Sequence, residues 1–294
     1  MALMDDLGML GLDGLSTENL YETEQKEEAK PAPAAKPAPE QKKEMSPQDE
    51  SALLFDKSYT CPVCTRGFTA KTVRTGKVHT IRIEYDLRPV YDKVDQVKYD
   101  VIACPHCGYA MLVRYHGSLS DKQCKMIRDS IGAKFRPQTW SADLYTYDEA
   151  KIRYQLALAN AVSRKAKASE KAYICIKMAW LVRGETEHLK QIPGVPDSKF
   201  TENAAAEKNY RGQALDGFAQ ARQTENFPIA GMDEKTLDYL MASLYLDMGK
   251  YQECARFIGN ILISKNISTN LRRKTEDLKM MLTETLKNSD PMKR

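Results

Sequence analysis

The sequence predicts an α+β fold that is mostly α-helical, with a small β-rich part ahead of a longer helical part. In the stretch HTIRIEYDL, residues 81–87 alternate apolar and polar side chains, which is typical of a half-buried strand. After residue 118 the apolar residues recur at helical spacing instead. Two C-x2-C pairs stand within the β-rich part, at 61–64 and 104–107. They make this part the first place to look for a functional site.

The chain opens with a leucine-rich peptide, residues 1–21, in which Leu3, Leu7 and Leu10 have the spacing of one helix face. Three glycines oppose a stable isolated helix there. Two interpretations stay open: a frayed chain start, or a tethered motif that orders in a groove. Residues 22–52 follow, rich in Pro, Ala, Glu and Lys. Such a segment buries too little apolar surface to offset its ordering entropy, so we expect a disordered linker.

Composition predicts a soluble protein without a membrane span. Of the 294 residues 42% are hydrophobic and 29% charged, and no run of about 18 apolar residues occurs. The first residues carry no basic leader of a signal peptide, so we expect a cytoplasmic protein with reduced thiols. Residues 1–57 hold 6 Lys and Arg against 13 Asp and Glu. The remainder is therefore basic, which permits contact with nucleic acid without requiring it.

The strongest chemical signal is a quartet of cysteines, Cys61, Cys64, Cys104 and Cys107, in the predicted domain 53–118. Each C-x2-C turn directs two sulfurs at one ion, and four thiolates make the tetrahedral set that Zn²⁺ favours. We predict a zinc-ribbon-like domain with a structural zinc ion; iron is the alternative ion for the same sulfurs. A redox dithiol is the rival role, although one pair would suffice for it. Four sulfur ligands leave no position for the water of a catalytic zinc.

Residues 119–290 predict a helical domain. Ser120 and Gln123 have the spacing of a capping box at its first helix, and Gly184 is predicted to end the third. Successive helices with short connections indicate hairpins stacked in an α-solenoid. The helices are expected at about residues 121–131, 148–164, 170–184, 201–224, 233–247, 250–264 and 268–287.

One pair of these helices, residues 239–262, resembles a tetratricopeptide repeat. Small residues at Ala242 and Cys254 let the two helices approach closely, and Gly249 ends the first of them. An ordinary helical bundle is the alternative interpretation. Carried onto this sequence, the positions that would line the concave, partner-binding face of the repeat are Tyr239, Ser243, Leu246 and Asp247.

Three stretches together resemble the DUF2225 family of uncharacterised bacterial proteins: FDKSYTCPVCTRGFTAKTVRTGK, YDVIACPHCGYAML and YDEAKIRYQLALANA. The resemblance covers about residues 52–265. It implies a paired C-x2-C, zinc-ribbon-like part followed by tetratricopeptide-like helices, and it implies no activity. Thr65 stands where such turns more commonly have glycine. The expected fold is therefore α+β, mostly α: a small β zinc ribbon followed by a tetratricopeptide-like α-helical solenoid.

The expected function is non-enzymatic. The sequence has no G-x-S-x-G, Walker, H-E-x-x-H or Rossmann motif and only 4 histidines. The leading hypothesis is a scaffold that binds a protein or peptide partner. The alternative is a nucleic-acid-binding module that uses basic residues near the first turn, with Phe68 and Tyr85 for stacking; a solvated strand face also explains these basic residues. They are Arg66, Lys71, Arg74, Lys77 and Arg82.

Overall fold

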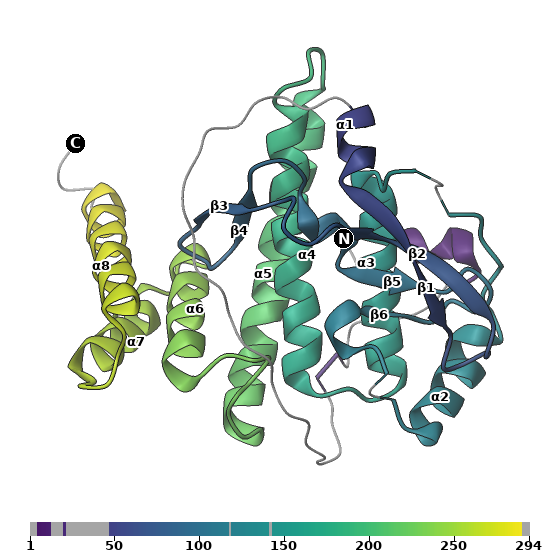
Figure 1. The fold of residues 1–294 in the computed structure, drawn as a ribbon. Coiled ribbons are helices and arrows are strands. Elements are labelled where there is room, and N and C mark those ends of the chain that lie inside the picture. Colours follow the sequence, from purple (N-terminus) through teal and green to yellow (C-terminus); the bar gives the residue numbers. More distant parts are fainter. Residues whose placement is uncertain (1–4, 13–19, 22–46, 118, 141–142, 290–294) are drawn as a thin grey trace.

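Figure 1 shows the fold of the protein as a computed structural model. Three small hairpins lie against a stack of long helices, so the predicted α-rich fold with a small β part is confirmed. Within the part of the chain that the structure describes, no helix is both long and apolar enough to span a membrane. Most of the predicted linker, residues 22–46, lies outside the described residues. These comprise residues 5–12, 20–21, 47–117, 119–140 and 143–289.

The described part of the N-terminal peptide packs onto the body. A 3-10 helix, η1 (Asp5–Leu10), begins it, and its leucines are buried in the main hydrophobic core with Leu12 and Leu20. The carbonyl oxygen of Leu10 accepts a hydrogen bond of 2.9 Å from the backbone N–H of Arg136. Apolar burial of this kind stabilises docking. The described residues therefore agree with the tethered-motif interpretation.

The β-rich part begins after a short helix, α1 (Pro47–Ala52), so ordered structure starts before the predicted end of the linker. Two antiparallel hairpins carry the cysteine pairs at their turns, and a third hairpin lies between them in sequence. Short 3-10 turns follow at η2 (Gln96–Tyr99) and η3 (Val113–Tyr115). The hairpins are β1 (Leu54–Thr60) with β2 (Gly67–Val73), β3 (Thr80–Ile83) with β4 (Pro89–Tyr91), and β5 (Val101–Ala103) with β6 (Ala110–Leu112).

The strand predicted over residues 81–87 is shorter than expected. Strand β3 ends at Ile83, and the backbone N–H of Leu87 donates to the carbonyl oxygen of Glu84 in a tight turn. Leu87 has a φ of 65°, the left-handed conformation that ends the extended chain. Asp86, which the alternation assigned to the solvent face, is fully buried in this turn.

The helices agree closely with those predicted. The capping box at Ser120 is present, with Gln123 as its partner. A π-helical turn, η4 (Arg128–Gly132), directly follows the helix that begins after Ser120. The helices are α2 (Asp121–Ile127), α3 (Tyr147–Ser163), α4 (Ala168–Leu189), α5 (Asp197–Thr224), α6 (Glu234–Asp247), α7 (Tyr251–Ile263) and α8 (Thr269–Ser289).

Gly184 does not end a helix, contrary to the prediction. Helix α4 continues through it to Leu189. A Cβ atom at this position would overlap the carboxylate of Asp95 and lie 3.2 Å from the hydroxyl oxygen of Tyr147. The lack of a side chain at this glycine therefore lets Asp95 and Tyr147 approach the backbone of α4 closely.

Helices α3 to α8 pack in sequence order, each against the next. Helix α5 has 28 residues, whereas α6 has 14 and α7 has 13. These unequal lengths depart from a regular repeat, so the described structure establishes a stack of helices, and the tetratricopeptide-like solenoid stays a prediction. One continuous hydrophobic core joins this stack to the hairpins, for example through Ile102, Tyr109 and Tyr154. The predicted units 53–118 and 119–290 thus share their core.

Candidate metal centre

The first C-x2-C turn closes the β1–β2 hairpin. The backbone N–H of Cys61 donates to the carbonyl oxygen of Arg66 at 3.0 Å, and the N–H of Thr65 donates back to Cys61 at 2.9 Å. Thr65 has a φ of 62°, which is unusual for a β-branched residue. This explains why glycine is more common at this position, and it leaves the cysteines correctly placed.

The second turn closes the β5–β6 hairpin with the same pattern. The N–H of Cys104 donates to the carbonyl oxygen of Tyr109 at 2.7 Å, and the N–H of Gly108 donates to Cys104 at 3.2 Å. Gly108 has a φ of 72°, and a Cβ atom there would overlap the ring of Phe135. Glycine is therefore required at this position both for its conformation and for the lack of space.

The two turns face each other and bring four sulfurs together. The Sγ atoms of Cys61 and Cys107 lie 3.6 Å apart, and those of Cys64 and Cys104 lie 3.7 Å apart. All four Sγ atoms are within 4.8 Å of one another. A tetrahedron with metal–sulfur distances of about 2.3 Å has edges of about 3.8 Å. The four sulfurs therefore match the size of a tetrahedral metal site.

Burial and mutual contact control the ionisation of these thiols. Cys61 and Cys104 are fully buried, Cys107 is buried and Cys64 is half-buried. Hydrogen bonds from the neighbouring thiols, first Cys107 and then Cys61, lower the pKa of Cys104. The same contacts, first with Cys104, raise the pKa of Cys107. Four thiolates this close require a cation, so binding a divalent metal would release protons.

Two side chains from the helical part hold the backbone of the turns. The guanidinium of Arg128 donates to the carbonyl oxygen of Val63, inside the first turn, at 3.2 and 2.8 Å. The side-chain amide of Asn160, on α3, donates to the carbonyl oxygen of Gly108 at 2.9 Å. Sequence analysis missed both residues, because neither lies near the cysteines in the chain. Such contacts orient metal-ligand turns.

The N-terminal peptide borders the same region. Phe135 packs on Gly108, and the backbone N–H of the next residue, Arg136, donates to the carbonyl oxygen of Leu10. Gly11 has a φ of 79°, and a Cβ atom there would lie 2.5 Å from the carbonyl oxygen of Lys134. The peptide therefore docks beside the second cysteine turn and α3.

No other candidate metal site occurs in the described ranges. The quartet is the only group there of three or more His, Cys, Asp or Glu side chains close enough to hold an ion. His106 is exposed, with Nε2 3.3 Å from the carbonyl oxygen of Gly67. Cys124, Cys175 and Cys254 are buried singly in helices, as small core residues are.

The four α6 residues that were predicted to line a concave, partner-binding face are not exposed. Tyr239, Ser243 and Leu246 are buried, and Asp247 is half-buried. The hydroxyl of Tyr85 donates to Asp247 at 2.6 Å, and Arg211 forms an ion pair with the same carboxylate at 3.0 Å. The prediction that these four positions line an open surface is wrong, because three of them are buried and the fourth is held by contacts from the β3–β4 turn and α5.

The two aromatic side chains that the nucleic-acid hypothesis assigned to base stacking, Phe68 and Tyr85, have other contacts in the structure. Phe68 is buried and stacks on Tyr59 with ring centroids 5.6 Å apart. The hydroxyl of Tyr85 is engaged by Asp247. Of the basic residues, Lys71 pairs with Asp56 at 3.1 Å. The rings that were predicted to stack with bases therefore belong to the core and to a buried polar contact.

A buried charge network was not predicted at all. Asp86, at the β3–β4 turn, contacts the guanidinium of Arg183 and accepts a hydrogen bond of 3.2 Å from the indole N–H of Trp180. Arg88 forms a bidentate pair with Glu187, with both distances 2.8 Å. No sequence signal was available, because Asp86 continues the alternation of polar residues that Arg82 and Glu84 begin. These contacts attach the third hairpin to α4 and position it beside α6 and α8.

A family model described as "Uncharacterized protein conserved in bacteria (DUF2225)" matches residues 54–282. The match spans the hairpins, the cysteine quartet and most of α8. No curated protein and no solved structure matches the chain.

Proposed function

The chain belongs to the DUF2225 family of proteins conserved in bacteria, and we propose that it is a non-enzymatic zinc protein that binds a protein partner. The observation that carries the first half of this proposal is the meeting of four cysteine sulfurs within 4.8 Å. The second half rests on the helical stack and its exposed apolar residues.

Zinc is the metal that best suits this donor set. Four thiolates from two C-x2-C turns are the ligands of closed, structural zinc sites. The distances of 3.6 and 3.7 Å between paired sulfurs fit its tetrahedron. Iron remains the alternative, since sulfur ligands also suit it. When bound, the ion would supply a cross-link between two hairpins and no catalytic chemistry.

The role of such a cross-link is to hold the hairpins on the helical stack. Arg128 and Asn160 already join one turn each to the helical part. Because the unfolded chain holds no preformed site, the free energy of metal binding adds to the free energy of folding. The seven cysteines form no disulfide, and we place the protein in the reducing cytoplasm.

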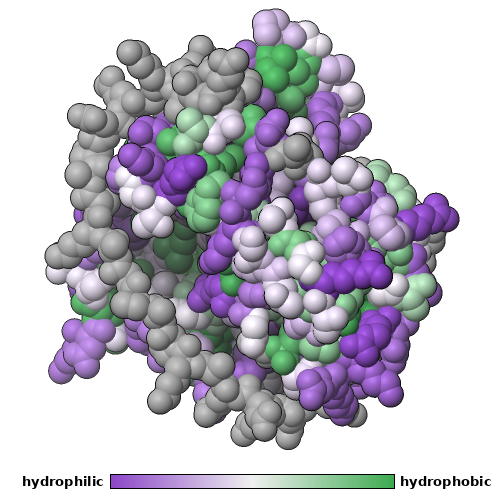
Figure 2. All heavy atoms as spheres, turned by 45° about the vertical axis from the view of Figure 1, so that its right-hand side comes forward, coloured by the Kyte–Doolittle hydropathy of each residue, from purple (hydrophilic) through white to green (hydrophobic). Residues whose placement is uncertain are grey.

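The partner surface is proposed on the last two helices. Ile263 on α7 is 81% exposed and Met280 on α8 is 58% exposed. Exposed large apolar residues on neighbouring helices favour protein association. On the face shown in Figure 2, by contrast, apolar residues form small separate groups among hydrophilic ones. We interpret α6 and α7 as tetratricopeptide-like, with this end of the stack as their binding surface.

Capture from a bacterial lysate by the immobilised full-length protein tests the partner role. We expect one protein to be retained in about stoichiometric amount and to be lost with the double variant Ile263→Asp, Met280→Asp. The exposed Lys265→Asp is the matched control. Equal recovery on all three proteins, or retention of nucleic acid with a steep salt dependence, would contradict this role.

A further inference from the structure

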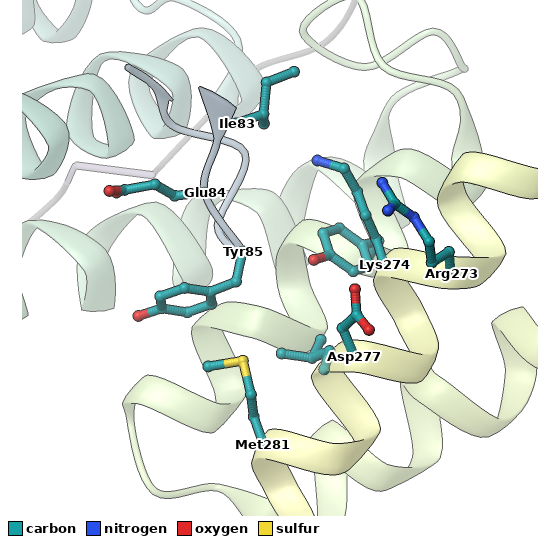
Figure 3. A pocket seen from close by; sticks show the side chains of 9 residues that line it. Ile83, Glu84, Tyr85, Arg273, Lys274, Asp277 and Met281 are labelled. Atoms are coloured by element: carbon teal, nitrogen blue, oxygen red, sulfur yellow. The ribbon is translucent and has the colours of Figure 1, made fainter. Parts of the chain in front are cut away.

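A cavity of about 200 Å³ opens between the β3–β4 hairpin and helix α8. Figure 3 shows Ile83 and Tyr85 on the hairpin side, facing Lys274, Asp277 and Met281 on α8. It lies on the far side of the helical stack from the cysteine quartet, which α3 and the β1–β2 and β5–β6 hairpins surround. The metal centre therefore does not explain it.

Two cations of α8 line this cavity without forming an ion pair. Arg273 and Lys274 extend in the same direction from the helix (Figure 3). Across the described ranges, no ion pair joins either of them to an acidic side chain. Burial, and then the nearby charge of Arg273, lower the pKa of Lys274. Two neighbouring cations at a cavity wall with one carboxylate, that of Asp277, leave a net positive charge that attracts an anion.

The hydroxyl of Tyr239 points to the same conclusion. Tyr239 is only 1% exposed, yet it lines the cavity. Its hydroxyl has no hydrogen-bond partner among the side chains and backbone groups that the structure describes. The oxygen itself is not one of the enclosed unpaired atoms there, so it is open to a hydrogen-bond partner in the cavity. An oxygen atom of a bound ligand would supply one.

The rest of the lining is apolar and limits the charge of the ligand. Ile83 and Met281 offer exposed aliphatic surface. Asp277 also lines the cavity and opposes a second negative charge. Glu84 points away from α8 (Figure 3) and is paired with Arg88 and Arg183, so its charge is already compensated. The side chains that face a ligand thus carry a net charge of about one positive unit.

We infer that this cavity binds a small aliphatic monocarboxylate, with the carboxylate on Arg273, Lys274 and the Tyr239 hydroxyl and the alkyl chain against Ile83 and Met281. This site goes beyond the proposed zinc and partner roles and does not depend on them. A phosphate monoester shares the anionic character but carries a further negative charge beside Asp277, which disfavours it.

Titration calorimetry of the full-length, metal-loaded protein with hexanoate tests the site. We expect a dissociation constant on the order of 1 mM, as suits so few ligand atoms. Hexanol and hexylammonium, which keep the alkyl chain and lose the anion, should bind at least about fivefold more weakly. Hexyl phosphate should bind more weakly than hexanoate.

Variants locate the binding. Arg273→Gln and Tyr239→Phe should each weaken hexanoate binding about fivefold. Lys279→Gln is the matched control, because it removes the same charge from an exposed position on α8 outside the cavity, and it should have no effect. No binding, equal binding of hexanol, tighter binding of hexyl phosphate, or equal loss with Lys279→Gln would each overturn the inference.

Discussion

The side-chain amide of Asn160 donates to the carbonyl oxygen of Gly108 at 2.9 Å and to that of Leu156 at 2.8 Å. One fully buried side chain thereby ties the second cysteine turn to helix α3. The metal centre is consequently part of the main core rather than a separate appendage.

Replacing Asn160 with leucine should destabilise the protein by about 1–3 kcal/mol, because it leaves the buried Gly108 carbonyl without a donor. It should also weaken metal binding by about tenfold or more, as loss of an orienting contact does. Chemical denaturation and competition with a chelator measure the two effects. Asn203→Leu is the control, since Asn203, on α5, is buried and donates to the hydroxyl of Thr186 on α4, away from the sulfurs. If both variants weaken metal binding equally, Asn160 has no special role.

Gly108→Ala should destabilise the second turn strongly, by about 2–4 kcal/mol, since the residue has a positive φ and no room for a Cβ atom beside Phe135. Gly67→Ala is the comparison, because nothing lies within 4 Å of a Cβ atom there. Thermal unfolding of the two metal-loaded variants measures the difference. Equal midpoints would show that the ring of Phe135 moves aside without strain.

Leu10→Ala should loosen the docked N-terminal peptide, with a loss of about 2–3 kcal/mol for the buried side chain. Hydrogen exchange reports this locally, because the amide of Arg136 is bonded to Leu10 and should exchange faster in the variant. The adjacent Met9 is 63% exposed, so Met9→Ala should leave that amide protected. Unchanged protection in both variants would mean that the peptide does not stay docked in solution.

Lys171 predicts a pH-dependent stability. Burial lowers its pKa to about 8, and the ring of Tyr21 covers its ammonium at 5.2 Å. In the unfolded chain the pKa of this lysine is about 10.4. Between the two pKa values, the unfolded chain therefore binds more protons than the folded protein. The free energy of unfolding should therefore rise by about 1 kcal/mol per pH unit from about pH 8 to about pH 10.

Denaturation across this range, compared between the wild type and Lys171→Met, isolates the effect. The variant should lose this part of the slope, whereas the exposed Lys167→Met should keep it. A slope that is the same in all three proteins would assign the pH dependence to other groups.

The parts of the fold that depend on local spacing could be predicted from sequence. The capping box at Ser120 marks a helix start within four residues, and each C-x2-C turn is a local backbone motif. The four cysteines were therefore identified without the structure. Asn160 and Arg128 could not be, because a contact from a side chain to a distant carbonyl leaves no periodic pattern.

The position of Asp86 was predicted wrongly from the local sequence pattern. Strand alternation assigned this residue to solvent, since a carboxylate is rarely buried without partners. Its partners, Arg183 and Trp180, lie about one hundred residues later on α4. The adjacent Tyr85 bonds to Asp247, one of the α6 positions that the repeat resemblance predicted to be open. Both errors involve long-range contacts of the β3–β4 turn.

The most direct test of the central claim is X-ray absorption spectroscopy of the full-length protein purified from cells supplied with zinc. We expect one zinc per chain with four sulfur neighbours at about 2.3 Å, and fewer sulfur neighbours in Cys64→Ser but not in Cys254→Ser. Well under one equivalent of zinc, or nitrogen and oxygen neighbours in the wild type, would contradict it.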